Sequence, residues 1–254
     1  MRKRFDFLFL VFTVTLCSLH FSTAQVKKLP EGFVDVKAMI PGIVLDMRYF
    51  TEHNFLGTRV RGYGATRCIL TREAAEALKK VQAELEPYGL SLKVYDAYRP
   101  QRAVDHFVEW AKDVSDTLTK REFYPLIDKG DLFPLGYISE RSSHSRGSTV
   151  DLTLVPVPVP EQEVYVPHEN LRPSHFPAAR RFGDNSLDMG TGFDAFHGNS
   201  ATESLAVGPQ QRANRLLLRT LMDKHGFRNY AEEWWHYTLR NEPYPETYFD
   251  FMIE

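Results

Sequence analysis

The chain has 254 residues, of which 43% are hydrophobic and 25% charged, and its formal net charge is −2. This balance excludes a disordered or collagen-like chain, and 31 Lys and Arg against 33 Asp and Glu leave no basic excess for binding a nucleic-acid backbone. Two cysteines exclude both a disulfide scaffold and a zinc site built from thiolates, and the length fits one domain or two at most.

The first 24 residues have the features of a secretory signal peptide. Residues 2–4 are basic, residues 5–19 are largely apolar with Asp6 as their one charged residue, and small residues precede Gln25. The apolar run is shorter than the about 20 residues that span a membrane, so export is favoured over an anchor. We therefore expect a mature domain of residues 25–254 that is periplasmic or extracellular, with Cys68 as a buried small hydrophobe.

The first half of this domain predicts two helices and a strand. Residues 71–88 have apolar side chains at helical spacing, and Thr71 suits the capping position at their start. Residues 90–95 alternate apolar and polar residues, as a half-buried strand does. A second helix is expected to begin at Pro100 and to face the core with Ala103, Phe107 and Trp110.

The second half predicts another strand, a long loop region, a helix and a last strand. Residues 148–154 alternate again, and residues 155–208 form the loop region, whose Pro-rich part at 155–177 is expected to be a lid over a binding pocket. A helix at 209–225 should face the core with Leu216, Leu217 and Leu221, and a strand follows at 234–239. Helices segregated from alternating strands predict an α+β fold, a single domain with a central antiparallel sheet flanked by helices.

Two histidine motifs carry the chemistry. His144 lies in a Ser-rich loop, and Asp151 lies on the polar face of the following strand, so both side chains can converge on one cation. His236 lies in an aromatic strand, with Glu233 three residues earlier. Two histidines and a carboxylate are the ligand set of a catalytic zinc, and a separate glutamate is the general base that such a site needs. Either histidine alone is more often a satisfied core residue, so the prediction depends on the combination.

Arg99 is a third candidate. It follows a predicted strand and immediately precedes a helix N-terminus, where positive potential gathers. Its fork of donors suits a carboxylate or a developing oxyanion. A purely structural ion pair with Asp96 is an equally favoured interpretation.

The motifs together resemble those of the D-alanyl-D-alanine dipeptidases of the VanX type. The similarity lies in Asp-Ala-Tyr-Arg-Pro at 96–100, Ser-x-His-x-x-Gly-x-x-x-Asp at 142–151 and Glu-x-x-His at 233–236, and it extends from about Val36 to the C-terminus. These enzymes are zinc peptidases related to D,D-carboxypeptidases and to the zinc domain of hedgehog proteins. The resemblance therefore implies a fold of that type and hydrolysis of a small D,D-dipeptide.

The resemblance also implies roles for residues of this chain. His144, Asp151 and His236 would hold one Zn²⁺, and Co²⁺ or Ni²⁺ would be substitutes that the same nitrogen and oxygen donors accept. Glu233 would be the general base that takes a proton from the attacking water and passes it to the leaving amine. Arg99 would stabilise the tetrahedral oxyanion.

Three further residues match pocket positions of these enzymes. Tyr49 and Ser142 would line the substrate pocket, and Asp96 would orient the arginine or shape the pocket. Members tied to glycopeptide resistance act in the cytoplasm, so export of this chain points instead to dipeptides released during cell-wall turnover. The alternatives are a D,D-carboxypeptidase or endopeptidase acting on muropeptides and a non-catalytic zinc-binding wall module. A retained general base and oxyanion donor argue against the last.

Overall fold

A computed structural model describes residues 28–254, and the expected signal peptide lies outside these residues. The described chain contains a five-stranded sheet and a two-stranded sheet. The larger sheet has the order β2-β4-β5-β7-β6, with strands at Val44–Leu45, Leu90–Asp96, Thr149–Pro156, His236–Leu239 and Phe227–Asn229. In the smaller sheet, β1 at Phe33–Asp35 pairs antiparallel with β3 at Ile69–Thr71.

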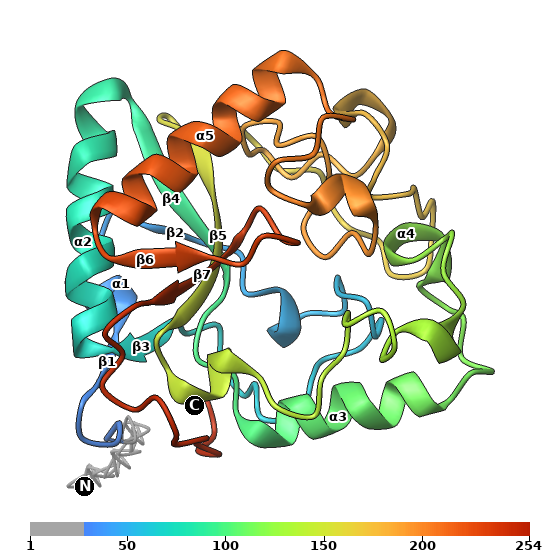
Figure 1. Cartoon of the computed structure of the whole chain (residues 1–254), viewed down its shortest axis with the longest axis horizontal. Helices are drawn as coiled ribbons and strands as arrows, with labels where there is room; N and C mark the ends of the chain where they lie inside the picture. Colours follow the sequence, from blue (N-terminus) through green and yellow to red (C-terminus); the bar gives the residue numbers. More distant parts are fainter. Residues whose placement is uncertain (1–27) are drawn as a thin grey trace, which may run out of the picture.

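Helices and long loops surround the larger sheet. The α-helices are α1 at Val36–Met39, α2 at Arg72–Leu85, α3 at Gln101–Lys112, α4 at Lys120–Phe123 and α5 at Pro209–Lys224. α2 contacts β4, α5 contacts β6, and these two helices also contact each other. Figure 1 shows α2 and α5 beside the strands, whereas α3, α4 and the loops between β5 and α5 lie together at the other side of the molecule. No helix within residues 28–254 has the length and apolar character needed to cross a bilayer.

The α+β prediction is confirmed, and most predicted elements are present. Thr71 caps α2 by accepting a hydrogen bond from the Ala74 amide, and a short 3-10 turn at Glu86–Tyr88 completes the predicted segment. α3 buries the expected face of Ala103, Phe107 and Trp110, and Cys68 is a buried free thiol. The expectation of a wholly antiparallel sheet is wrong in one pair, because the edge strand β2 runs parallel to β4.

The central strands are buried on both faces, so the prediction of half-buried strands is wrong. Lys93 of β4 is 1% exposed, and its ammonium donates to Gln162 Oε1 at 2.6 Å and to the Asp184 carbonyl at 2.8 Å. It also lies 3.1 Å from the Asp46 carboxylate. The polar positions are buried because the loops after β5 cover the second face, which alternation within one strand cannot reveal.

The inward face of α5 also differs from the prediction. Leu216 is 56% exposed and Leu217 is 39% exposed, whereas Arg215, Leu218 and Met222 are buried. Because three leucines follow one another, their spacing does not show which side of the helix faces the core. The buried Arg215 determines which side does. The Arg215 guanidinium donates to three backbone carbonyls, those of Met189, Ala201 and Asn199, so its burial is compensated.

Candidate active site

The strand register positions the first site residues. Asp151 in β5 pairs with Asp96 of β4 on one side and with His236 of β7 on the other. Directly opposed residues project from the same face of a sheet, so these three side chains lie in a row. A register shift between Val94 and Asp96 bends β4 at this point. The sheet therefore gathers residues that are far apart in the sequence.

His144 reaches this row from a tight turn. Ser143–Arg146 forms a 3-10 turn, which the Ser142 hydroxyl caps by accepting a hydrogen bond from the His144 amide. Gly147 ends the turn with φ +82°, and a Cβ on it would lie 2.3 Å from Phe33 Cε1. Only glycine fits both this backbone conformation and this close approach. The turn brings His144 back over the start of β5, where Asp151 follows.

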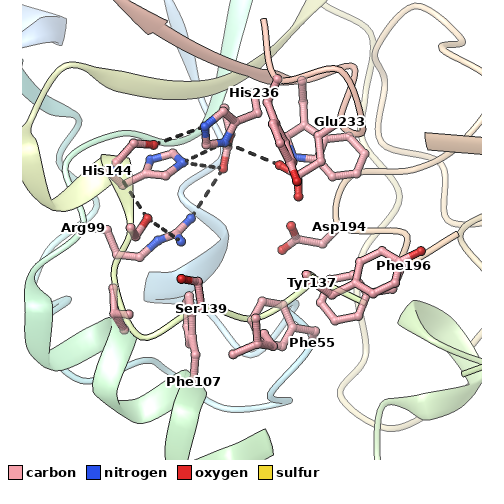
Figure 2. Close-up of a pocket in the computed structure, with 18 of the residues that line it drawn as sticks. Phe55, Arg99, Phe107, Tyr137, Ser139, His144, Asp194, Phe196, Glu233 and His236 are labelled. Carbon is pink, nitrogen blue, oxygen red and sulfur yellow. Dashed lines mark hydrogen bonds and ion pairs between the residues drawn. The ribbon is translucent and has the colours of Figure 1, made fainter. Parts of the chain in front are cut away.

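His144, Asp151 and His236 form a compact cluster of three potential metal ligands (Figure 2). His144 Nε2 lies 3.3 Å from Asp151 Oδ2 and 3.3 Å from His236 Nδ1, and His236 Nδ1 lies 3.2 Å from Asp151 Oδ1. Burial opposes ionisation of Asp151, but the two histidines outweigh it and lower the pKa of the carboxyl. The cluster is therefore anionic at its carboxylate and presents nitrogen lone pairs beside it.

The cluster fits a bound metal ion in three respects. His144 Nδ1 donates to the Ala97 carbonyl at 2.7 Å, because a carbonyl only accepts, and this leaves Nε2 free as a ligand. Asp151 Oδ1 is buried without a hydrogen-bond partner among the described residues. Ligands about 2.0–2.1 Å from a tetrahedral ion stand roughly 3.3–3.4 Å apart, which matches the separations in this cluster.

Glu233 lies beside the cluster, just before β7. Its Oε2 is 3.4 Å from His236 Nδ1, and its side chain is 26% exposed. Enclosure in the pocket raises the pKa of Glu233 to about 7, with Asp151 adding to the rise and His236 opposing it. A carboxyl with this pKa exchanges protons readily near neutral pH, as a general acid and base must.

Arg99 forms the ion pair with Asp96 that was considered for it, and it also lines the pocket. Its Nε donates to Asp96 Oδ2 at 2.9 Å, and its Nη2 lies 3.5 Å from Asp151 Oδ2. Asp96 is fully buried, accepts a second hydrogen bond from the Tyr63 hydroxyl at 2.7 Å, and does not line the pocket. Asp96 therefore acts on the pocket through Arg99 and through His144, whose Nδ1 lies 3.5 Å from Asp96 Oδ2. The Arg99 guanidinium also packs over the Tyr49 ring at 4.9 Å.

A pocket of about 270 Å³ opens in front of the cluster. Seven of the eight residues singled out from the sequence line it, all except Asp96: Tyr49, Arg99, Ser142, His144, Asp151, Glu233 and His236. Its remaining walls come from Phe55, α3, residues 136–143, residues 194–196, Tyr230 and Trp235. No residue of 155–177 lines the pocket, so the expectation of a Pro-rich lid is wrong. That segment is held elsewhere, by the bond from Lys93 to Gln162 and by stacking of Tyr165 on His53 at 3.9 Å.

Asp194 is a pocket residue that the sequence reasoning did not select. It is 6% exposed, and its Oδ2 accepts a hydrogen bond from the Tyr49 hydroxyl at 2.8 Å. Figure 2 shows its carboxylate facing the same space as Arg99 and Glu233. Burial raises the pKa of Asp194 well above its ordinary value, and the negative charge of Asp151 adds to this. Within residues 28–254 no Lys or Arg forms an ion pair with it, so a cationic ligand group would complete its environment.

Comparison with known proteins identifies the family. The family described as D-ala-D-ala dipeptidase matches residues 30–157 and 180–254, which leaves out most of the Pro-rich segment. A D-alanyl-D-alanine dipeptidase of Enterococcus faecalis is 37% identical over 225 residues, 89% of this chain and 100% of that protein. One of Streptomyces coelicolor is 39% identical over 221 residues, 87% of this chain and 98% of its own length. One of Escherichia coli is 30% identical over 206 residues, 81% of this chain and 83% of that protein.

These matches cover the motifs that form the pocket, since the cluster of three potential metal ligands, Glu233 and Arg99 all lie within the matched ranges. The fold, the cluster of potential ligands and the extent of the sequence identity all point to the same family. The chain therefore belongs to the D-ala-D-ala dipeptidase family and is a peptidase.

Proposed function

We propose that the chain is a zinc-dependent dipeptidase that hydrolyses D-alanyl-D-alanine to free D-alanine. The observation that carries the proposal is the composition of one pocket of about 270 Å³. It holds a nitrogen, nitrogen and oxygen ligand cluster, a carboxyl suited to proton transfer and a buried carboxylate without a cationic partner among the described residues. A pocket at the small end of the range for ligand sites favours a small substrate.

Zinc is the metal that the donor set favours. Two imidazoles and one carboxylate with an open position are typical of catalytic zinc sites, in which the protein supplies three ligands. When bound, the ion would supply positive charge that polarises the scissile carbonyl and favours ionisation of a nearby water molecule.

Glu233 would carry the proton during hydrolysis. Its carboxylate accepts a proton from the attacking water as the oxygen–carbon bond forms. It then donates that proton to the amine nitrogen as the carbon–nitrogen bond breaks, so the two products are free amino acids. Its position 3.4 Å from His236 keeps the proton acceptor beside the ligand cluster throughout.

Arg99 would stabilise the oxygen that becomes negative in the tetrahedral transition state. Asp96 fixes its Nε, and the Tyr49 ring supports its guanidinium. Nη1 and Nη2 therefore stay beside Ser142 and Asp151, which both line the pocket. A donor held in advance needs no reorganisation when charge develops, which is the basis of this kind of stabilisation.

Asp194 would bind the free ammonium group of the substrate. An ammonium beside this buried carboxylate would offset the burial that now raises its pKa. A longer muropeptide has no ammonium at this position, because an amide bond replaces it. This feature favours a dipeptidase over a D,D-carboxypeptidase or endopeptidase.

We also propose that the enzyme acts outside the cytoplasm, on dipeptide released during cell-wall turnover. The basic and apolar N-terminal 24 residues support export. Fractionation of cells and N-terminal sequencing of the secreted chain test this. A full-length chain that stays in the cytoplasm would contradict it.

A substrate panel tests the proposed activity. The four stereoisomers of Ala-Ala and a longer peptide ending in D-Ala-D-Ala are incubated with the purified chain, with and without a chelator. We expect release of D-alanine from the D,D-dipeptide, loss of activity with the chelator and recovery when Zn²⁺ is restored. Release from the longer peptide with the dipeptide untouched would refute the dipeptidase assignment and support a carboxypeptidase.

A further inference from the structure

The wall formed by residues 139–143 contains hydroxyl groups whose protons are free to bind an acceptor. Ser142 Oγ accepts from the His144 amide at 3.3 Å and from Arg99 Nη1 at 3.4 Å. Ser139 Oγ accepts from the Arg141 amide at 3.4 Å. No described residue accepts a hydrogen bond from either hydroxyl, although both residues line the pocket. Each hydroxyl therefore has a proton available for an anionic ligand.

Arg141 adds an uncompensated positive charge to this wall. It lines the pocket, and its guanidinium packs over the Tyr248 ring at 5.2 Å. Arg146 packs on the same ring at 5.8 Å, but Glu242 neutralises it through two hydrogen bonds of 2.9 and 2.8 Å. Within residues 28–254, Arg141 forms no ion pair. Of the two described arginines that line the pocket, Arg99 is paired with Asp96, so Arg141 is the one without an acidic partner.

The pocket therefore has the acidic side chain of Asp194 on one wall and, on another, the arginine and serine hydroxyls of residues 139–142. Figure 2 shows Ser139 and Asp194 on the two sides of the open space in front of Glu233. We propose that Arg141 binds the C-terminal carboxylate of the substrate, together with the hydroxyls of Ser139 and Ser142. This inference rests on the proposed function in taking the substrate to be a peptide with a free C-terminus.

The role makes Arg141 a specificity-determining residue. A guanidinium and two hydroxyl donors favour a carboxylate over a neutral amide, because the ionic hydrogen bonds are the stronger ones. The enzyme would accordingly select peptides with a free C-terminus and reject amidated or cross-linked ones.

The test compares D-Ala-D-Ala with its C-terminal amide in the wild type and in Arg141→Gln. We expect kcat/KM for the acid to fall about tenfold in the variant, mainly through KM, as loss of one charge-assisted hydrogen bond at a partly exposed site implies. The amide should be hydrolysed almost equally well by both proteins, so the acid-to-amide ratio falls by the same factor. Arg141→Lys should restore part of the ratio. Arg121→Gln, which alters an exposed arginine of α4 that does not line the pocket, is the matched control.

An unchanged acid-to-amide ratio in Arg141→Gln would overturn the inference. An equal change in Arg121→Gln would also overturn it, because the effect would then follow from net charge alone. If the wild type cleaves only a longer peptide ending in D-Ala-D-Ala, the dipeptidase proposal fails separately. The same acid-to-amide ratio, measured on that peptide, still decides the role of Arg141.

Discussion

Replacing Gly147 with alanine is expected to destabilise the protein and to disturb the ligand cluster at the same time. Gly147 has φ +82°, and it ends the turn that carries His144. Its carbonyl accepts a hydrogen bond from the Thr71 amide at 2.7 Å, so the turn is also tied to the start of α2. Any shift of the backbone here moves His144 relative to Asp151.

The expected loss of stability comes from two separate causes. An L-residue in the left-handed region costs about 1–2 kcal/mol. The added Cβ would stand 2.3 Å from Phe33 Cε1 and 2.8 Å from Cζ. Phe33 is 5% exposed and packs against four aromatic rings, so it cannot simply move aside. Overpacking of this kind costs about 1–3 kcal/mol, which gives a total of about 2–5 kcal/mol.

The assay is urea denaturation of the wild type, Gly147→Ala and a matched control, Gly130→Ala. A Cβ on Gly130 would meet nothing within 4 Å, so this variant should unfold within about 1 kcal/mol of the wild type. Phe33→Leu in the Gly147→Ala background should recover part of the loss, since it makes room for the new methyl group. Equal stability of Gly147→Ala and Gly130→Ala would refute the reasoning.

Two further predictions concern the buried charges. Burial alone would raise the pKa of Asp46, but Arg48 and Lys93 outweigh it and hold the pKa well below the usual value. The ionised Asp46 therefore stabilises the folded state above pH about 4, and this stabilisation is lost as the pH falls further. In thermal unfolding measured against pH, Asp46→Asn should be less stable by about 3–5 kcal/mol at pH 7. Its stability should also fall less steeply than that of the wild type as the pH is lowered. Tyr63→Phe removes the hydroxyl that donates to Asp96, and steady-state kinetics should show kcat reduced about tenfold with little change in KM, because an interaction made in the transition state weakens.

Each of these predictions has a contradicting outcome, and Tyr63→Phe also has a matched control. A wild-type acid limb in Asp46→Asn would mean that other carboxylates govern unfolding at low pH. Tyr88→Phe, at a side chain that is 81% exposed, should leave the kinetics unchanged. If Tyr63→Phe matches Tyr88→Phe, the hydrogen bond to Asp96 has no influence on the reaction.

Local motifs made the ligand cluster predictable from the sequence. An aspartate in mid-strand requires an explanation by chemistry, because strands disfavour it and a buried carboxylate needs a cation or donors. The two histidines gained significance only in combination with it. The alternation of residues 148–154 placed Asp151 on one face, and the register with His236 then follows from the sheet. Helix α2 was predictable because its apolar spacing and its cap agree.

Contacts between distant segments were not predictable in the same way. Asp194 meets the Tyr49 hydroxyl across 145 residues of chain, and no periodicity marks either residue as part of one pocket. The short strands β2 and β6 have two and three residues, too few to show alternation. The phase of α5 depends on acceptors for Arg215 that come from a distant loop.

Metal content and turnover, measured on the same samples of two variants, test the central claim most directly. Glu233→Gln should retain one equivalent of Zn²⁺ and lose about 100- to 10,000-fold in D-Ala-D-Ala turnover, because it removes the proton carrier and no ligand. Asp151→Asn should lose both the bound Zn²⁺ and the turnover, since it removes a charged ligand. Glu232→Gln, at the neighbouring position, should keep its Zn²⁺ and its turnover. Wild-type turnover by Glu233→Gln, or full zinc content with full activity in Asp151→Asn, would contradict the account.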